Sequence, residues 1–154
     1  GGDSVVVESI VKLPFFSTYD VLLASDGKLY MATDGDGLWR VDTDLSEKSE
    51  FEHILSYGEQ PKELNKIYAM MQSADNDIWL GTQMGGVFRL SLDREKGVNY
   101  SSDFGLENMV VSDFLELPNG DLFIATDGHI KQYFKGRLEH AWQYLAFHLG
   151  RRYN

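Results

Sequence analysis

The stretch Asp26-Gly27-Lys28-Leu29-Tyr30-Met31-Ala32-Thr33 occurs in three related versions along this chain. The other two are Asp75-Asn76-Asp77-Ile78-Trp79-Leu80-Gly81-Thr82 and Asn119-Gly120-Asp121-Leu122-Phe123-Ile124-Ala125-Thr126. Each version starts with a turn dipeptide and a charged residue, continues with an apolar, an aromatic, an apolar and a small residue, and ends on threonine. The threonines lie 49 and 44 residues apart, and the three versions align without gaps. Periods of this length are typical of propellers, solenoids and other repeat arrays.

Each version is predicted to form short antiparallel strands joined by tight turns. In the third version a first strand is expected over residues 110–117, before Pro118-Asn119-Gly120, and Asn-Gly is a strong hairpin signal. A short apolar strand, a glycine-containing turn and a third strand follow. A fourth, more variable strand is expected near residues 50–56, 97–101 and 138–145. Four antiparallel strands in about 45 residues make the blade of a β-propeller, whereas common helical solenoids have shorter periods.

We therefore predict an all-β fold in which residues 1–154 form a single propeller segment of about three four-stranded antiparallel blades. The blades are expected at residues 19–56, 67–101 and 110–145, with residues 4–15 as the outer strand of a preceding blade. Rings usually close with four to eight blades. The sequence thus predicts an incomplete propeller, which is either part of a larger one or a homo-oligomer whose copies complete one another. Residues 138–149 also fit helical spacing, and this alternative stays open.

The composition of the chain disfavours several classes of binding partner and of metal site. The formal net charge of −10 disfavours nucleic acid and anionic membranes as the main partner. No cysteine is present, so disulfides and thiolate metal sites are excluded. No apolar run approaches the roughly 18 residues of a membrane span.

Catalytic and metal-binding motifs are not evident, so we predict no cofactor, no metal and no enzyme activity for this segment. The loop Asp34-Gly35-Asp36-Gly37 is acidic, but Leu38 and Leu45 stand where a calcium loop of the EF-hand type needs oxygen ligands. The four histidines lack metal-binding spacing, and no Gly-x-Ser-x-Gly nucleophile motif occurs.

Residues 19–134 resemble the two-component regulator propeller repeat. The resemblance rests on Phe104-Gly105-Leu106-Glu107-Asn108-Met109-Val110, on the third version of the repeated stretch, and on Ile78-Trp79-Leu80-Gly81-Thr82 with Gly85-Gly86-Val87. The family pattern has Gly-Leu, an asparagine, a first strand, Asp-Gly, Leu-Trp-Ile-Gly-Thr and a Gly-Gly-Leu turn. Tyr30 and Phe123 replace its tryptophan, and Ala32 and Ala125 replace its glycine.

This resemblance implies a sensor. Such propellers are periplasmic or extracellular input modules of bacterial hybrid histidine kinases and related receptors, and their ligands are often oligosaccharides. The parent protein would then be anchored in a membrane, with the kinase activity outside this segment. Two alternatives stay open: a non-catalytic structural or protein-interaction propeller, and a propeller lyase or hydrolase.

Loop residues that differ between the repeats are the best candidates for ligand contacts. The turns after the threonines and the starts of the first strands are expected on one propeller face, because consecutive antiparallel strands alternate in direction. The candidates there are Tyr19, Asp34, Asp36, Asn65, Gln83, Met84, Asn108, Asp127 and His129. Their polar, aromatic and methionine side chains would suit a carbohydrate or another small ligand. Tyr30, Trp79 and Phe123 share one repeat position and are predicted to pack between blades.

Overall fold

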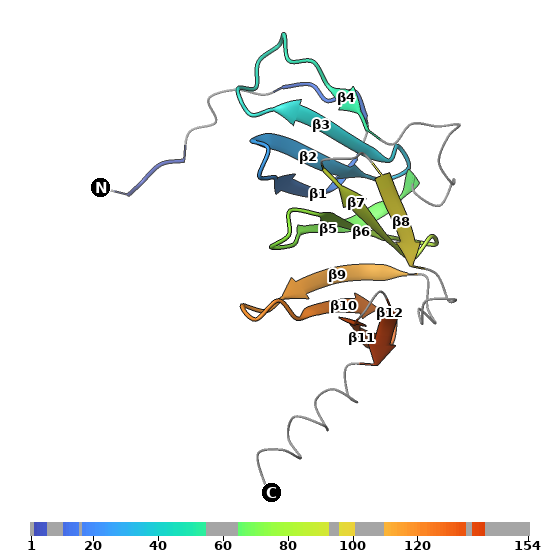
Figure 1. Ribbon diagram of the computed structural model, residues 1–154. Helices are drawn as coiled ribbons and strands as arrows, with labels where there is room; N and C mark the ends of the chain where they lie inside the picture. The colour runs from blue at the N-terminus through green and yellow to red at the C-terminus, as the bar shows by residue number, and fades with distance from the viewer. Residues whose placement is uncertain are drawn as a thin grey trace, which may run out of the picture.

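The chain forms three four-stranded antiparallel sheets stacked on one another (Figure 1). This is a computed structural model, and it describes residues 2–5, 11–15, 17–54, 65–92, 96–100, 110–134 and 137–140. Within these residues all regular secondary structure is β-strand. The predicted all-β fold with three blades is confirmed.

The strands of each sheet pair in chain order, as in a propeller blade. Blade 1 consists of β1 (Thr18–Leu23), β2 (Lys28–Thr33), β3 (Leu38–Asp42) and β4 (Glu52–His53). Blade 2 consists of β5 (Ile67–Gln72), β6 (Ile78–Thr82), β7 (Val87–Ser91) and β8 (Lys96–Tyr100). Blade 3 consists of β9 (Val111–Glu116), β10 (Leu122–Thr126), β11 (His129–Phe134) and β12 (Arg137–His140). The first strands meet across the stack, β1 against β5 and β5 against β9.

Two details of the predicted strand layout need correction. The fourth strand of blade 1 has two residues, Glu52–His53, and does not extend over 50–56. Residues 4, 5 and 11–15 do not form the strand predicted over 4–15, although Phe15 still packs on blade 1. Residues 6–10, and residues 141–149 with their helical alternative, lie outside the described residues. Within the described part of the chain, no helix is long and apolar enough to cross a membrane.

The turn between the first two strands has the same geometry in every blade. Gly27, Asn76 and Gly120 occupy its last position with φ of 77°, 69° and 88°. Glycine adopts this left-handed conformation without strain, and asparagine tolerates it better than most residues. The repeated Asp-Gly, Asp-Asn and Asn-Gly dipeptides therefore specify one turn type.

The repeated threonines close the second turn of each blade. Their hydroxyls donate to the carbonyl oxygen on the far side of the turn: Thr33 to Gly37 at 2.7 Å, Thr82 to Gly86 at 2.8 Å and Thr126 to His129 at 3.2 Å. All three threonines are buried, so these bonds satisfy hydroxyls that water does not reach. The threonine that the three repeats share thus has a structural role.

The apolar core lies between the blades. Tyr30 and Ala32 of blade 1 pack with Ile78 and Leu80 of blade 2 in one buried cluster. Trp79 and Val87, from the opposite face of blade 2, pack with residues of blade 3 that include Leu122 and Ile124. Because both faces of β6 are covered, all five of its residues are buried.

The predicted packing of the repeated aromatic residue is confirmed at Tyr30 and Trp79, which are buried between blades. It is wrong for Phe123, which is only partly buried. Phe123 lies on the face of blade 3 that points away from blade 2. Whether the aromatic residue at this repeat position is buried or half-buried therefore depends on whether another sheet packs against its face.

A charged network reinforces the junction between blades 2 and 3. The Arg89 guanidinium lies 5.3 Å from the ring centroid of Trp79 and 5.7 Å from that of Tyr133, and it donates to the Tyr133 hydroxyl at 3.0 Å. Asp77 and Asp75 accept from the same guanidinium at 2.6 and 2.7 Å. One arginine thus bridges a turn of blade 2 to a strand of blade 3.

Candidate functional site

An extra residue in each first strand directs side chains at the edge of the blade stack. The register shifts between Thr18 and Asp20 in β1 and between Ile67 and Ala69 in β5, so Tyr19 and Tyr68 are the inserted residues. A β-bulge leaves its extra residue out of the ladder and re-aims its side chain. Bulges are common beside binding sites, so this position is a natural place to look for one.

The two bulged tyrosines contact each other across blades 1 and 2. Their ring centroids lie 5.2 Å apart at an interplanar angle of 68°, an edge-to-face pair. Tyr19 is 46% exposed and Tyr68 is partly exposed. The pair therefore presents aromatic surface to solvent next to the turns that follow the threonines.

An ion pair adjoins the tyrosines. The Lys66 ammonium lies 3.1 Å from a carboxylate oxygen of Asp34, and each side chain keeps about a third of its surface exposed. Asp34 sits on the turn of blade 1, and Lys66 immediately precedes β5 of blade 2. The backbones of the two residues also form an isolated antiparallel bridge.

Backbone hydrogen bonds hold the turn of blade 1 on the start of blade 2. The amides of Gly35 and Gly37 both donate to the carbonyl of Asn65, at 2.8 and 3.0 Å. The amide of Gln83 donates to the carbonyl of Lys66 at 3.0 Å, which joins the turn of blade 2 to the same segment. The candidate site is therefore Tyr19, Asp34, Asn65, Lys66 and Tyr68, and its backbone is fixed by these contacts.

Each of the three titratable groups of the site is stabilised by its neighbours in the protonation state that it has at neutral pH. The Lys66 ammonium, with a smaller effect of Tyr19, lowers the pKa of Asp34. The Asp34 carboxylate in turn raises the pKa of Lys66. The hydrogen bond with Asp34 raises the pKa of the Tyr19 phenol. At neutral pH the site thus contains a carboxylate, an ammonium and a neutral phenol.

The structure brings together only some of the residues predicted from the sequence. Tyr19, Asp34 and Asn65 meet, and the backbone of Gln83 adjoins them. Asp36 lies apart on the outer side of blade 1, where its carbonyl accepts from the Trp39 indole at 3.0 Å and lies 2.8 Å from His53 Nε2. The remaining predicted residues are Met84 on the turn of blade 2, Asp127 and His129 on that of blade 3, and Asn108, which lies outside the described residues.

Sequence reasoning missed Lys66 and Tyr68. Lys66 precedes its repeat threonine by 16 residues, and Ser17 and Val110 hold the same place in the other repeats. A charged residue at a position that is otherwise uncharged breaks the repeat, and that signal is visible once the repeats are aligned. Tyr68 is the repeat equivalent of Tyr19, and aligning the repeats shows that the two tyrosines occupy the same position.

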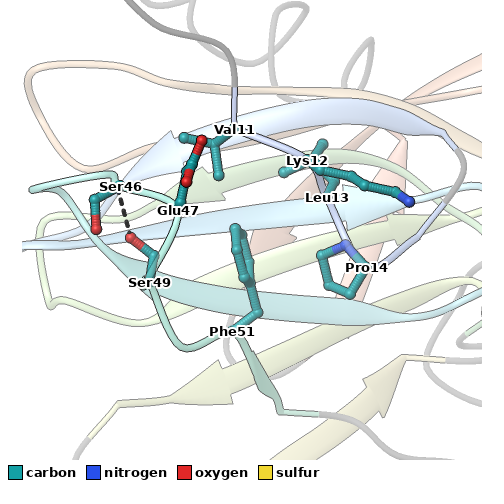
Figure 2. A pocket seen from close by; sticks show the side chains of 8 residues that line it. All are labelled: Val11, Lys12, Leu13, Pro14, Ser46, Glu47, Ser49 and Phe51. Atoms are coloured by element: carbon teal, nitrogen blue, oxygen red, sulfur yellow. Dashed lines mark hydrogen bonds between the residues drawn. The ribbon is translucent and has the colours of Figure 1, made fainter.

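A separate cavity of about 430 Å³ lies on the outer side of blade 1 (Figure 2). Its lining consists of Val11, Lys12, Leu13, Pro14, Ser46, Glu47, Ser49 and Phe51. None of the residues predicted as ligand contacts lines it. Among the described residues, no group of three or more histidine or acidic side chains is placed to hold a metal ion.

Solved structures with the same fold include extracellular domains of one-component and two-component systems. No protein-family model matches the chain, and no curated protein matches it either. The extracellular domain of a putative one-component system from B. thetaiotaomicron superposes with a TM-score of 0.65 at 19% identity, over 80% of this chain and 16% of that one. The extracellular domain of a putative hybrid two-component system from the same organism gives 0.59 at 22%, over 83% and 15%.

An enzyme shares the fold as well. Virginiamycin B lyase from Staphylococcus aureus superposes with a TM-score of 0.61 at 15% identity, over 80% of this chain and 40% of the lyase. The chain spans only about one sixth of the length of the two extracellular domains. These similarities establish the propeller-type fold, and function must be argued from the site.

Proposed function

We propose that the chain is part of a ligand-sensing, extracytoplasmic propeller of a bacterial two-component receptor of the hybrid histidine kinase type. The fold shared with extracellular domains of putative hybrid two-component systems supports this proposal. The resemblance of residues 19–134 to the two-component regulator propeller repeat supports it independently. In this proposal the parent receptor is anchored in a membrane and its output domain lies outside the 154 residues.

We further propose that the ligand is a carbohydrate, or another small molecule with one apolar and one polar side, and that it contacts the Tyr19–Tyr68 pair. The observation that carries this is the exposed aromatic pair beside the Asp34–Lys66 ion pair. The C–H face of a sugar ring packs on aromatic rings, while its hydroxyls bond to carboxylate and ammonium groups. A small number of polar groups beside aromatic surface is the usual composition of such sites.

Binding of oligosaccharides to the 154-residue chain tests the proposal. A glycan array identifies candidates, and isothermal titration calorimetry on the purified chain measures their affinity. We expect Tyr19→Ala and Tyr68→Ala each to weaken binding roughly tenfold, because each removes one ring of the pair. Lys66→Met should weaken it as well by removing the ammonium donor.

Met84→Ala is the matched control. Met84 lies on the turn of the same face and is 69% exposed, but it belongs to the turn of blade 2 and lies outside the tyrosine pair. Its removal should leave the affinity unchanged. A glycan whose binding survives the tyrosine substitutions but not Met84→Ala would contradict the assigned site. Absence of binding by any glycan would contradict the ligand class.

A further inference from the structure

Positive charge is scarce on the face of the blade stack that holds the candidate site. This loop face is formed by the starts of the first strands and by the turns after the threonines. Its described residues are 17–20, 33–37, 65–68, 82–86, 110–113 and 126–129, and they contain five aspartates and one lysine, Lys66. The charged groups that a ligand meets on this face are therefore mostly carboxylates.

Asp34 already takes up the charge of Lys66. Its carboxylate oxygen lies 3.1 Å from the ammonium, and the Tyr19 hydroxyl is hydrogen-bonded to the same carboxylate. The ammonium lowers the pKa of Asp34, and the carboxylate raises the pKa of Lys66, so both groups are charged at neutral pH. A ligand at this point thus meets an ion pair without net charge.

The backbone builds this ion pair into the junction of blades 1 and 2. Asp34 and Lys66 form an antiparallel bridge, and the Asp34 amide donates to the Ser17 carbonyl at 3.1 Å. An ordinary surface ion pair contributes little, because ordering two flexible side chains costs entropy. Here the two backbones are already held side by side, which lowers that cost. The fold therefore keeps Asp34 on Lys66.

A second carboxylate is fixed close to the tyrosines. Asp20 follows Tyr19 in β1, and its two oxygens accept from the amides of Val21 at 2.9 Å and Met70 at 2.8 Å. The bond from Met70 crosses from blade 2 to blade 1. Charges of the same sign repel over a screening length of about 8 Å at physiological ionic strength. The surroundings of the ion pair thus disfavour an anionic ligand.

The ion pair distinguishes this junction from the next one. At the junction of blades 2 and 3, Gln83 is the repeat equivalent of Asp34. Val110 is the repeat equivalent of Lys66, and neither replacement is charged. The inserted residue of β9 is Ser112, so blade 3 also has no tyrosine at its bulge. The charged pair and the aromatic pair therefore occur together at one junction, as expected for parts of one site.

We propose that Asp34 is a specificity-determining residue that keeps Lys66 neutralised, so that the site accepts a neutral oligosaccharide and rejects one that carries carboxylates. This inference rests on the proposed function, because it takes the tyrosine pair as the place where a carbohydrate binds. One sugar hydroxyl can accept from the Lys66 ammonium while a neighbouring hydroxyl donates to Asp34. A uronate would instead compete with Asp34 for the ammonium and leave one carboxylate unpaired.

Matched pairs of oligosaccharides that differ only in charge test this inference. The probes are cellotetraose, mannotetraose and galactotetraose, each beside the same tetrasaccharide with its primary hydroxyls oxidised to carboxylates. Isothermal titration calorimetry on the purified 154-residue chain measures the Kd of both members of each pair. We expect the oxidised member of the pair that binds to have a Kd at least about tenfold higher than the neutral member.

Asp34→Asn should remove this discrimination. The asparagine keeps a side-chain oxygen and nearly the same volume, but it releases the Lys66 ammonium to pair with a ligand carboxylate. We expect the ratio of the two Kd values to fall about tenfold, chiefly through tighter binding of the oxidised member. The double variant D34N/K66M should lose this gain, because no ammonium is left at the site.

Asp42→Asn is the matched control. It changes the net charge by the same amount and releases Lys28, which lies 3.2 Å from Asp42. Lys28 begins β2 whereas Thr33 ends it, so this lysine lies at the end of the strand away from the loop face. The ratio of the two Kd values should therefore be unchanged in Asp42→Asn. Circular dichroism of each variant checks that the blades are folded.

The outcomes separate this inference from the proposed function. If the neutral member binds through the tyrosines but the oxidised member binds equally well or better, the role of Asp34 is wrong and the carbohydrate site stands. Equal changes in Asp34→Asn and Asp42→Asn would also overturn that role, since they would reflect net charge alone. If no member of any pair binds, the proposed ligand class fails, and this inference fails with it.

Discussion

Gly81 of blade 2 lies directly against Val111 of blade 3. A Cβ atom added to Gly81 would lie 2.7 Å from Val111 Cγ1 and 3.0 Å from the Val111 carbonyl oxygen. Separations this short between carbon atoms are strongly repulsive, and the oxygen belongs to the backbone of β9. Gly81, the residue before Thr82, therefore sets how closely blade 3 approaches blade 2.

Gly81→Ala should destabilise the fold by about 1–3 kcal/mol, because the added methyl group forces blade 3 away from blade 2. Urea unfolding followed by tryptophan fluorescence measures the loss. The double variant G81A/V111A should recover part of it, since Val111 Cγ1 is removed while the carbonyl contact remains. Equal stability of Gly81→Ala and the unmodified chain would mean that the blades are farther apart than described.

Trp79→Ala should lower the free energy of unfolding by about 3–5 kcal/mol, since it removes a large side chain that is only 2% exposed. It also removes the indole donor to Ser73 Oγ at 3.1 Å and the ring beneath Arg89. Phe123→Ala, at the same repeat position but on an end face, should cost clearly less. A loss under about 1 kcal/mol for Trp79→Ala would show that this ring is not buried.

The blades could be predicted from sequence because their determinants are local. Gly27, Asn76 and Gly120 specify one turn within four residues of chain, and the threonine hydroxyl closes the next turn three or four residues away. Because these interactions span only a few residues, the residue types that make them recur in each repeat. The two-residue length of β4 was not predictable, because the fourth strands share no common residue pattern.

The candidate site was predicted only in part, because its contacts join different repeats. Asp34 and Tyr19 were selected for their place on the loop face, but their partners Lys66 and Tyr68 come from the next blade. Pairing across a blade junction depends on how the sheets stack and not on local sequence. The exposure of Phe123 was missed for the same reason, since burial at that position depends on the neighbouring sheet.

Thr82→Val should destabilise blade 2 by about 1–3 kcal/mol through lost hydrogen bonds at nearly constant volume. The buried Thr82 hydroxyl donates to the carbonyl of Gly86 at 2.8 Å and accepts from the amide of Gly85 at 2.8 Å. Thr126→Val is the comparison, because the Thr126 hydroxyl donates over 3.2 Å to His129 in a shorter turn. Urea unfolding midpoints, at unchanged slope, should fall further for Thr82→Val. The opposite order would contradict the assigned role of the hydroxyl.

The Asp34 site should respond to pH at both extremes. The pKa of Asp34 is lowered from 3.8, so its contribution to stability is fully present above 3.8 and is lost as pH falls through the lowered value. The pKa of Lys66 is raised from 10.5, so its contribution is present below 10.5 and is lost as pH rises through the raised value. The ion pair is therefore intact across neutral pH.

Substitutions within the site should shift these titrations in known directions. Lys66→Met should raise the pKa of Asp34 back toward 3.8, because it removes the main stabiliser of the carboxylate. Asp34→Asn should lower the pKa of Tyr19 back toward 10.0, because the hydrogen bond with the carboxylate is what chiefly raises it. Carboxyl-carbon NMR follows Asp34, and tyrosinate absorbance follows the phenol. Lys28→Met, which removes a lysine paired with Asp42 at 3.2 Å, should leave both titrations unchanged. If the pKa of Asp34 were unchanged in Lys66→Met but shifted in Lys28→Met, the ion pair beside the tyrosines would not form.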